Sequence, residues 1–162
     1  MNAARGDLAF LPLGGTGEIG MNLNLYRCAT PRGEKWLAVD CGIGFGGPEH
    51  PEVDTMAPDP SYIEERQRDL VGLVITHAHE DHIGAVAHLW PRLRCPVYAT
   101  PFGAAVLRRK LGEAGLTNSV KLHVVPNGGE VELAPFKLRF VRVSHSIPEA
   151  HALAIRTPYG LV

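Results

Sequence analysis

The stretch Thr76-His77-Ala78-His79-Glu80-Asp81-His82 decides the fold. It has the pattern H-x-H-x-D-H, so four metal-competent side chains fall within six residues. With the histidine and aspartate frequencies of this chain, such a pattern arises by chance in roughly one sequence in a thousand. The apolar run 70–76 leads into it and is too short for a helix, which favours a strand buried on both faces. We therefore expect the histidines at the exit of a buried strand.

The spacing of these side chains predicts a site for two metal ions. Residues two apart in an extended segment share a face, so His77 and His79 can meet on one ion. Asp81 and His82 come where the chain turns into a helix and can face a neighbouring ion, with a water bridging the two. Neutral imidazoles and a carboxylate suit zinc, which lowers the pKa of a bound water to about 7. The alternative is a polar helix cap with Asp81 as N-cap, but this leaves three histidines unexplained.

A third ligand is expected from elsewhere in the chain, because catalytic zinc usually has three protein ligands. His145 is the best candidate, since it follows the predicted strand 136–143 as His77 follows the strand 70–76. Three other histidines are typical of surface or packed positions: His50, His88 and His123. His151 remains open because it is close to His145 in sequence.

The rest of the chain predicts a layered α/β fold in one domain. Apolar runs and period-two alternation indicate early strands at 8–13, 21–26 and 35–40 and later strands at 120–125, 130–133, 136–143 and 152–157. Helices are expected from Asp59-Pro60 to about Leu70, from Ile83 to Pro91, and from Thr100-Pro101 to Gly112 or Gly115. No linker or repeat divides the 162 residues.

Composition limits the partners and the compartment. The 16 basic and 17 acidic residues nearly balance, so any RNA-binding face must come from local placement. Three widely spaced cysteines, Cys28, Cys41 and Cys95, fit free thiols in a reducing cytoplasm, with Cys41 in the core. No stretch approaches the ~18 apolar residues that a membrane span needs, and Met1 to Asp7 is small and polar. We expect a soluble cytoplasmic protein.

Two further motifs have simpler structural interpretations. Residues 15–20 match G-x-G-x-x-G, with Asp40 about twenty residues on, as in dinucleotide sites. However, 21–26 alternates as a strand where that motif needs a helix, so a glycine-rich hairpin is favoured and no dinucleotide is expected. Arg108-Arg109-Lys110 could touch phosphate, although the charged face of an amphipathic helix is the preferred interpretation.

Four ordered blocks, 11–20, 39–42, 76–84 and 144–148, together resemble the N-terminal part of the ribonuclease J family. These are metallo-β-lactamase-fold nucleases with a β-CASP insertion. The resemblance implies an αββα sandwich of mixed β-sheets with flanking helices. It implies that His77, His79 and His145 hold one zinc and that Asp81 and His82 hold the other. It also implies hydroxide attack on RNA phosphodiesters, with 5′-to-3′ exonuclease and endonuclease activity in RNA processing and decay.

The chain departs from that family in its extent. Family members continue with a strand that ends in a metal-bridging aspartate, then with the β-CASP domain, a last histidine ligand and a C-terminal domain. Residues 1–162 are therefore expected to form only the first half of the metallo-β-lactamase domain. We expect at most one well-bound zinc, weak or no nuclease activity for these residues alone, and an open sheet edge that allows self-association.

Two rival interpretations keep the metal site and change the function. A thioesterase or lactonase of the glyoxalase II kind shares the histidine run and the hydroxide chemistry. A non-catalytic metal-binding or assembly module would bind the metal without turnover.

Overall fold

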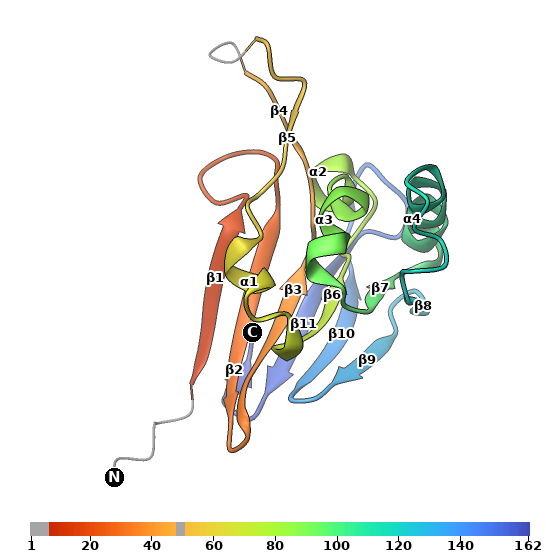
Figure 1. Ribbon diagram of the computed structural model, residues 1–162. Helices are drawn as coiled ribbons and strands as arrows, with labels where there is room; N and C mark the ends of the chain where they lie inside the picture. The colour runs from red at the N-terminus through yellow and green to blue at the C-terminus, as the bar shows by residue number, and fades with distance from the viewer. Residues whose placement is uncertain (1–6, 48–50) are drawn as a thin grey trace.

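The computed structural model describes residues 7–47 and 51–162, which form two stacked β-sheets with helices over one outer face (Figure 1). The larger sheet has the strand order β1-β2-β3-β6-β7-β8, and the smaller has the order β12-β11-β10-β9. One apolar core lies between the helices and the larger sheet. A second core lies between the two sheets. This arrangement confirms the predicted layered α/β fold.

The larger sheet positions the histidine motif. Its strands are β1 (Leu8–Gly14), β2 (Leu23–Thr30), β3 (Gly33–Val39), β6 (Leu70–Val74), β7 (Val97–Ala99) and β8 (Leu122–Val124). β1, β2 and β3 pair antiparallel, and β6, β7 and β8 continue from β3 in parallel. The segments that follow β3 and β6 therefore leave the sheet at the same edge, the one formed by the carboxyl ends of the parallel strands. This is where ligands bind in open α/β sheets.

The glycine-rich segment 15–20 joins β1 to β2, as the hairpin interpretation predicted. β2 begins at Leu23, later than the predicted 21, because Gly20 and Met21 still have positive φ angles of 115° and 49°. A Cβ on Gly14 would lie 2.2 Å from the carbonyl oxygen of Met21, so the turn requires glycine there. A strand, and not a helix, follows these glycines.

The smaller sheet is antiparallel and packs one face on the larger sheet. Its strands are β9 (Glu130–Leu133), β10 (Phe136–Arg142), β11 (His151–Thr157) and β12 (Gly160–Leu161). Phe136 and Phe140 of β10 are buried between the sheets, whereas Lys137 and Arg139 face outward. β4 (Gly44–Phe45) and β5 (Thr55–Met56) pair with each other and project from the top of the molecule in Figure 1.

The helices are α1 (Ser61–Glu64), the 3-10 turn η1 (Gln67–Asp69), α2 (Glu80–Ile83), α3 (Val86–Leu93) and α4 (Pro101–Glu113). The prediction of one helix from Asp59 to Leu70 is wrong in length. Ile63 is the buried residue of α1, and the polar Arg66 and Gln67 provide no apolar stripe for another turn. None of the helices in 7–47 and 51–162 is long and apolar enough to cross a membrane.

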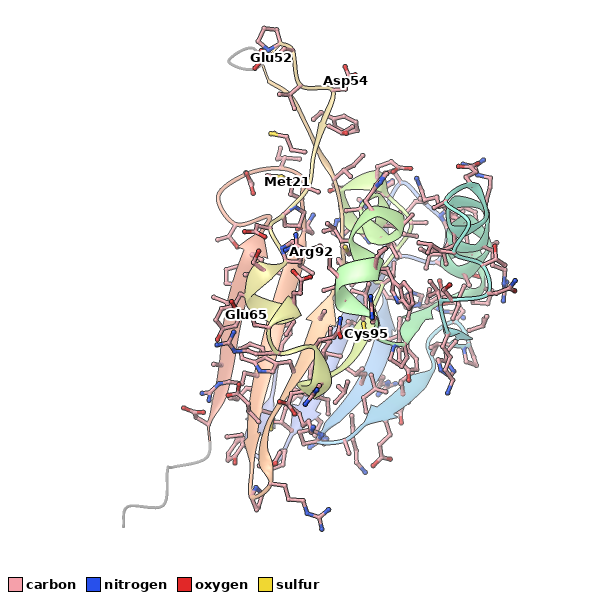
Figure 2. All side chains as sticks on the ribbon, viewed as in Figure 1. Met21, Glu52, Asp54, Glu65, Arg92 and Cys95 are labelled. Atoms are coloured by element: carbon pink, nitrogen blue, oxygen red, sulfur yellow. The ribbon has the colours of Figure 1, made fainter. Side chains whose placement is uncertain are left out.

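The predicted helix from Ile83 to Pro91 is wrong at both ends, because Ile83 ends α2 while α3 begins at Val86 and continues past Pro91. Burial of Leu89 and Leu93, one turn apart, offsets the backbone hydrogen bond that the proline lacks. Arg92 of the same helix points toward α1 (Figure 2), where its Nε lies 2.8 Å from Oε2 of Glu64.

The three cysteines are free and buried, as predicted. Cys41 is fully buried in the core between the helices and the larger sheet.

Candidate metal centre

The histidine motif lies at the edge where β6 ends. His79 is the N-cap residue of α2, with extended φ and ψ angles of −69° and 148°, so Asp81 lies inside the first turn and is not the N-cap. The backbone N–H of Cys41 donates to the carbonyl oxygen of His82 at 2.8 Å, and that of Asn22 donates to the carbonyl oxygen of Asp81 at 3.1 Å. The segments after β1 and β3 thus hold the motif against the sheet.

Three histidines converge at this edge. One ring nitrogen from each of His77, His79 and His145 lies within 4.8 Å of the other two. The ring centroids are 4.7 to 5.0 Å apart. His145 reaches the site from the exposed loop of residues 143–150, which joins β10 to β11. The structure therefore brings together the two motif histidines and the predicted third ligand.

His77 is prepared to bind a cation through Nε2. The residue is 8% exposed, and its buried Nε2 has no hydrogen-bond partner among the described residues. Nδ1 lies 2.9 Å from Oγ1 of Thr76, whose hydroxyl donates to the carboxylate of Asp40. Because that hydroxyl proton is used, the Thr76 oxygen accepts from Nδ1–H and the Nε2 lone pair is left free. An unpaired buried nitrogen beside two other imidazoles fits a metal ion.

The electrostatics at His77 favour the neutral imidazole that a metal requires. Burial, followed by the proximity of His82, lowers the pKa of His77 to about 4, against a raising effect of Asp40. Protons therefore compete weakly for this nitrogen at neutral pH.

Asp81 and His82 form a second pair beside the three histidines. Oδ2 of Asp81 lies 3.3 Å from Nε2 of His82, close to the ~3.4 Å that separates two ligands on one tetrahedral zinc-sized ion. Burial lowers the pKa of His82, but the hydrogen bond and charge of Asp40, together with Asp81, outweigh it, so the net pKa is raised. His82 therefore binds a proton more readily than His77 does.

Asp40 is the residue that the sequence interpretation missed. It is 3% exposed and follows β3 with a positive φ of 62°. It accepts from the Thr76 N–H at 2.8 Å and from His82 Nδ1 at 2.7 Å. A carboxylate that holds the far nitrogen of a ligand histidine sets its tautomer and orientation. The available signal was its position at a strand exit beside the exit of β6.

The other histidines of the described residues lie apart from this cluster. His151 is buried and bonded to the Glu149 carbonyl and the Asn127 side chain. His123 stacks on Tyr98, and His88 is exposed. His50 lies outside the described residues.

The basic run on α4 needs one correction. Arg108 and Arg109 are exposed, as expected for a charged helix face. Lys110, in contrast, has a side chain only 18% exposed and pairs with both oxygens of Glu80 at 2.7 and 2.9 Å.

Comparisons with known proteins agree with this geometry. The family model described as "Beta-lactamase superfamily domain" matches residues 35–162. Ribonuclease J from Sinorhizobium meliloti is 47% identical over 156 residues, covering 96% of this chain and 28% of that protein. Ribonuclease J from Synechocystis sp. is 37% identical over 157 residues, covering 96% and 24%. The structure of Rm3 metallo-beta-lactamase matches with a TM-score of 0.57 at 19% identity, covering 93% of this chain and 57% of that chain.

The chain spans about a quarter of the length of these curated relatives. Their names support the prediction of a hydrolase, and the structural match confirms the predicted fold. The chain belongs to the beta-lactamase superfamily, has part of the metallo-β-lactamase fold, and is similar in sequence to ribonuclease J, as its four motif blocks indicated.

Proposed function

We propose that this chain belongs to a zinc-dependent hydrolase that cleaves RNA phosphodiesters in the cytoplasm, as an exonuclease and endonuclease. The convergence of His77, His79 and His145 around a buried, unpartnered Nε2 carries the proposal. The 47% identity to a ribonuclease J supports RNA as the substrate. The three buried free thiols fit a reducing compartment.

Zinc fits this set of donors because it favours imidazole nitrogen and tolerates a carboxylate. In the proposal, His77, His79 and His145 hold one zinc, and Asp81 with His82 holds part of a second site. A bound zinc supplies a nucleophile at neutral pH by lowering the pKa of water.

The chain's own contribution is to orient the donors. The carboxylate of Asp40 accepts a hydrogen bond from Nδ1–H of His82 at 2.7 Å, so the Nε2 lone pair of His82 is left to face Asp81. Through the Thr76 hydroxyl, Asp40 also sets the tautomer of His77. One buried carboxylate thus prepares a nitrogen at each of the two proposed positions.

We further propose that residues 1–162 form the N-terminal part of a metallo-β-lactamase domain within a longer protein that includes β-CASP and C-terminal domains. The share of the relatives that the chain covers supports this view. Asp81 and His82 supply only two donors, so these residues alone should hold at most one zinc firmly and show weak or no cleavage. Readily detected RNA cleavage by purified, zinc-loaded 1–162 would contradict this proposal.

The edge strands β1 and β8 could also pair with another chain. We propose homo-oligomer formation through such an edge. Light scattering at high protein concentration should then give more than the monomer mass, and a monomer would refute it.

The function is tested with the complete protein on 5′-monophosphorylated RNA and on a thioester. We expect RNA cleavage, its loss in His77→Ala, and its retention in His88→Ala, which removes an exposed histidine. Thioester cleavage without RNA cleavage would favour a glyoxalase II-like enzyme. Metal binding without turnover of either substrate would favour a non-catalytic module.

A further inference from the structure

Helix α4 contacts both segments that carry the three histidines. One contact joins its first turn to the loop 143–150, which carries His145. The other joins its third turn to Glu80, the residue after His79. Glu80 and Glu149 are far apart in the sequence, and a single helix contacts both of them.

The first contact is made by the side chain of Glu149. Its Oε2 accepts from the backbone N–H of Phe102 at 2.8 Å. Thr100, the N-cap residue of α4, makes no side-chain capping bond, so Glu149 supplies an acceptor that the helix start otherwise lacks. A carboxylate at the N-terminus of a 13-residue helix is also favoured by the helix dipole.

The contact at Glu149 also restrains His145, because a hydrogen bond joins the two ends of the loop that carries both residues. The Val143 N–H donates to the Ala150 carbonyl at 3.1 Å. The carbonyl oxygen of Glu149 lies 2.7 Å from His151 Nδ1, and His151 Nε2 lies 2.8 Å from the Asn127 side-chain oxygen. The His151 side chain is 4% exposed and therefore holds the C-terminal end of the loop through buried hydrogen bonds. Glu149 itself has a positive φ of 55°. This backbone conformation is unfavourable for a non-glycine residue, so the hydrogen bonds of its side chain and carbonyl are needed to maintain it.

The second contact is the ion pair of Lys110 with Glu80. Nζ of Lys110 lies 2.7 and 2.9 Å from the two carboxylate oxygens of Glu80. The carbonyl oxygen of Glu80 accepts from Ile43 N–H and Gly84 N–H, so the backbone next to His79 is held on two sides. Phe102 and Lys110 are eight residues apart on one helix, a fixed span of about 12 Å.

We propose that α4 is a brace that sets the separation of His79 and His145, with Glu149 and Lys110 as positioning residues of the metal site. The inference rests on the proposed metal-binding function. His145 lies on an exposed loop, so its ring would otherwise have to be ordered at the moment of metal binding. Loss of a residue that orients a ligand typically weakens metal binding by about 10- to 100-fold.

The test is a titration with cobalt(II), whose visible spectrum reports the number and geometry of its ligands, on the wild-type protein and five variants. Glu149→Ala and Lys110→Met should each bind cobalt about tenfold more weakly and with an altered spectrum. Glu149→Gln keeps an oxygen acceptor for Phe102 and should recover most of the wild-type affinity. Glu113→Ala removes an exposed α4 carboxylate, paired only with Arg109 among the ion pairs of the described residues, and should bind as wild type.

His145→Ala serves as the reference for loss of the third ligand, and thermal unfolding of each metal-free variant shows whether it folds. If His145→Ala weakens binding but Glu149→Ala and Lys110→Met bind as wild type, the brace is refuted and the metal site stands. A Glu149→Gln variant as weak as Glu149→Ala would also refute it. Identical spectra for wild type and His145→Ala would refute both the metal site and the brace.

Discussion

Replacing Asp40 by asparagine should reverse the tautomer of His82 and leave the backbone unchanged. Asp40 has a φ of 62°, a region that asparagine also tolerates. The asparagine oxygen can still accept from the Thr76 N–H, now 2.8 Å from Oδ1. Its NH₂ group would replace Oδ2, which accepts from His82 Nδ1 at 2.7 Å. Because an amide N–H only donates, His82 must accept through Nδ1 and carry its proton on Nε2.

The magnitude follows from the bond that is exchanged. A hydrogen bond to a charged group contributes about 1.5 to 3 kcal/mol and a neutral one about 0.5 to 1.5 kcal/mol, so the free energy of unfolding should fall by about 1 to 2 kcal/mol. The pKa of His82 should fall as well, because the charge and hydrogen bond of Asp40 now raise it. Metal affinity at the Asp81–His82 pair should drop about 10- to 100-fold. The three-histidine position should keep its metal, since Thr76 can still accept from His77.

Nitrogen-15 NMR of the histidine rings distinguishes the two tautomers, and urea unfolding gives the stability change. Asp69→Asn is the matched control, because Asp69 is a half-exposed partner of Lys35. The reasoning is refuted if His82 keeps its proton on Nδ1 in Asp40→Asn, or if His77 changes tautomer as well.

Two further outcomes are expected. The pKa of His77 is lowered from 6.5 to about 4, so its neutral form stabilises the fold fully above pH 6.5, and this contribution is lost as the pH falls toward 4. In urea unfolding of the metal-free protein, the stability difference between wild type and His77→Ala should therefore shrink from pH 7 to pH 4.5. A constant difference would contradict the lowered pKa. A Cβ on Gly42 would lie 1.7 Å from the carbonyl oxygen of Asp81, so Gly42→Ala should lower stability by about 1 to 3 kcal/mol or more. A Cβ on Gly47 meets no atom of the described residues within 4 Å, so Gly47→Ala should melt as wild type. Equal melting of both variants would argue against the packing described for the motif.

Local patterns were sufficient to predict most of the longer strands and the three histidines that the structure brings together, but not the short strand β7. The apolar run before His77 was too short for a helix and favoured a buried strand, and β6 occupies most of it. His145 was predicted as third ligand because it follows a strand as His77 does, and its ring lies beside those of His77 and His79. Strand-exit position is informative because neighbouring strands deliver their next residues to the same edge.

The support for the site could not be predicted in the same way. Asp40, Glu149 and Lys110 act on residues 42, 47 and 30 positions away in the chain. Each is an ordinary charged residue in its local sequence, and only the tertiary packing gives it a buried or bridging role. The prediction of the length of α1 was wrong for a related reason, since Asp59 and Pro60 mark where a helix starts but not how far it continues.

The most direct test is elemental analysis of zinc in the purified wild-type protein, in His77→Ala and in His145→Ala, with His88→Ala as control. The proposed site predicts about one zinc per chain in wild type and in the control, and its loss in both other variants. Absence of zinc from the wild type, or zinc retained in both His77→Ala and His145→Ala, would contradict the three-histidine centre.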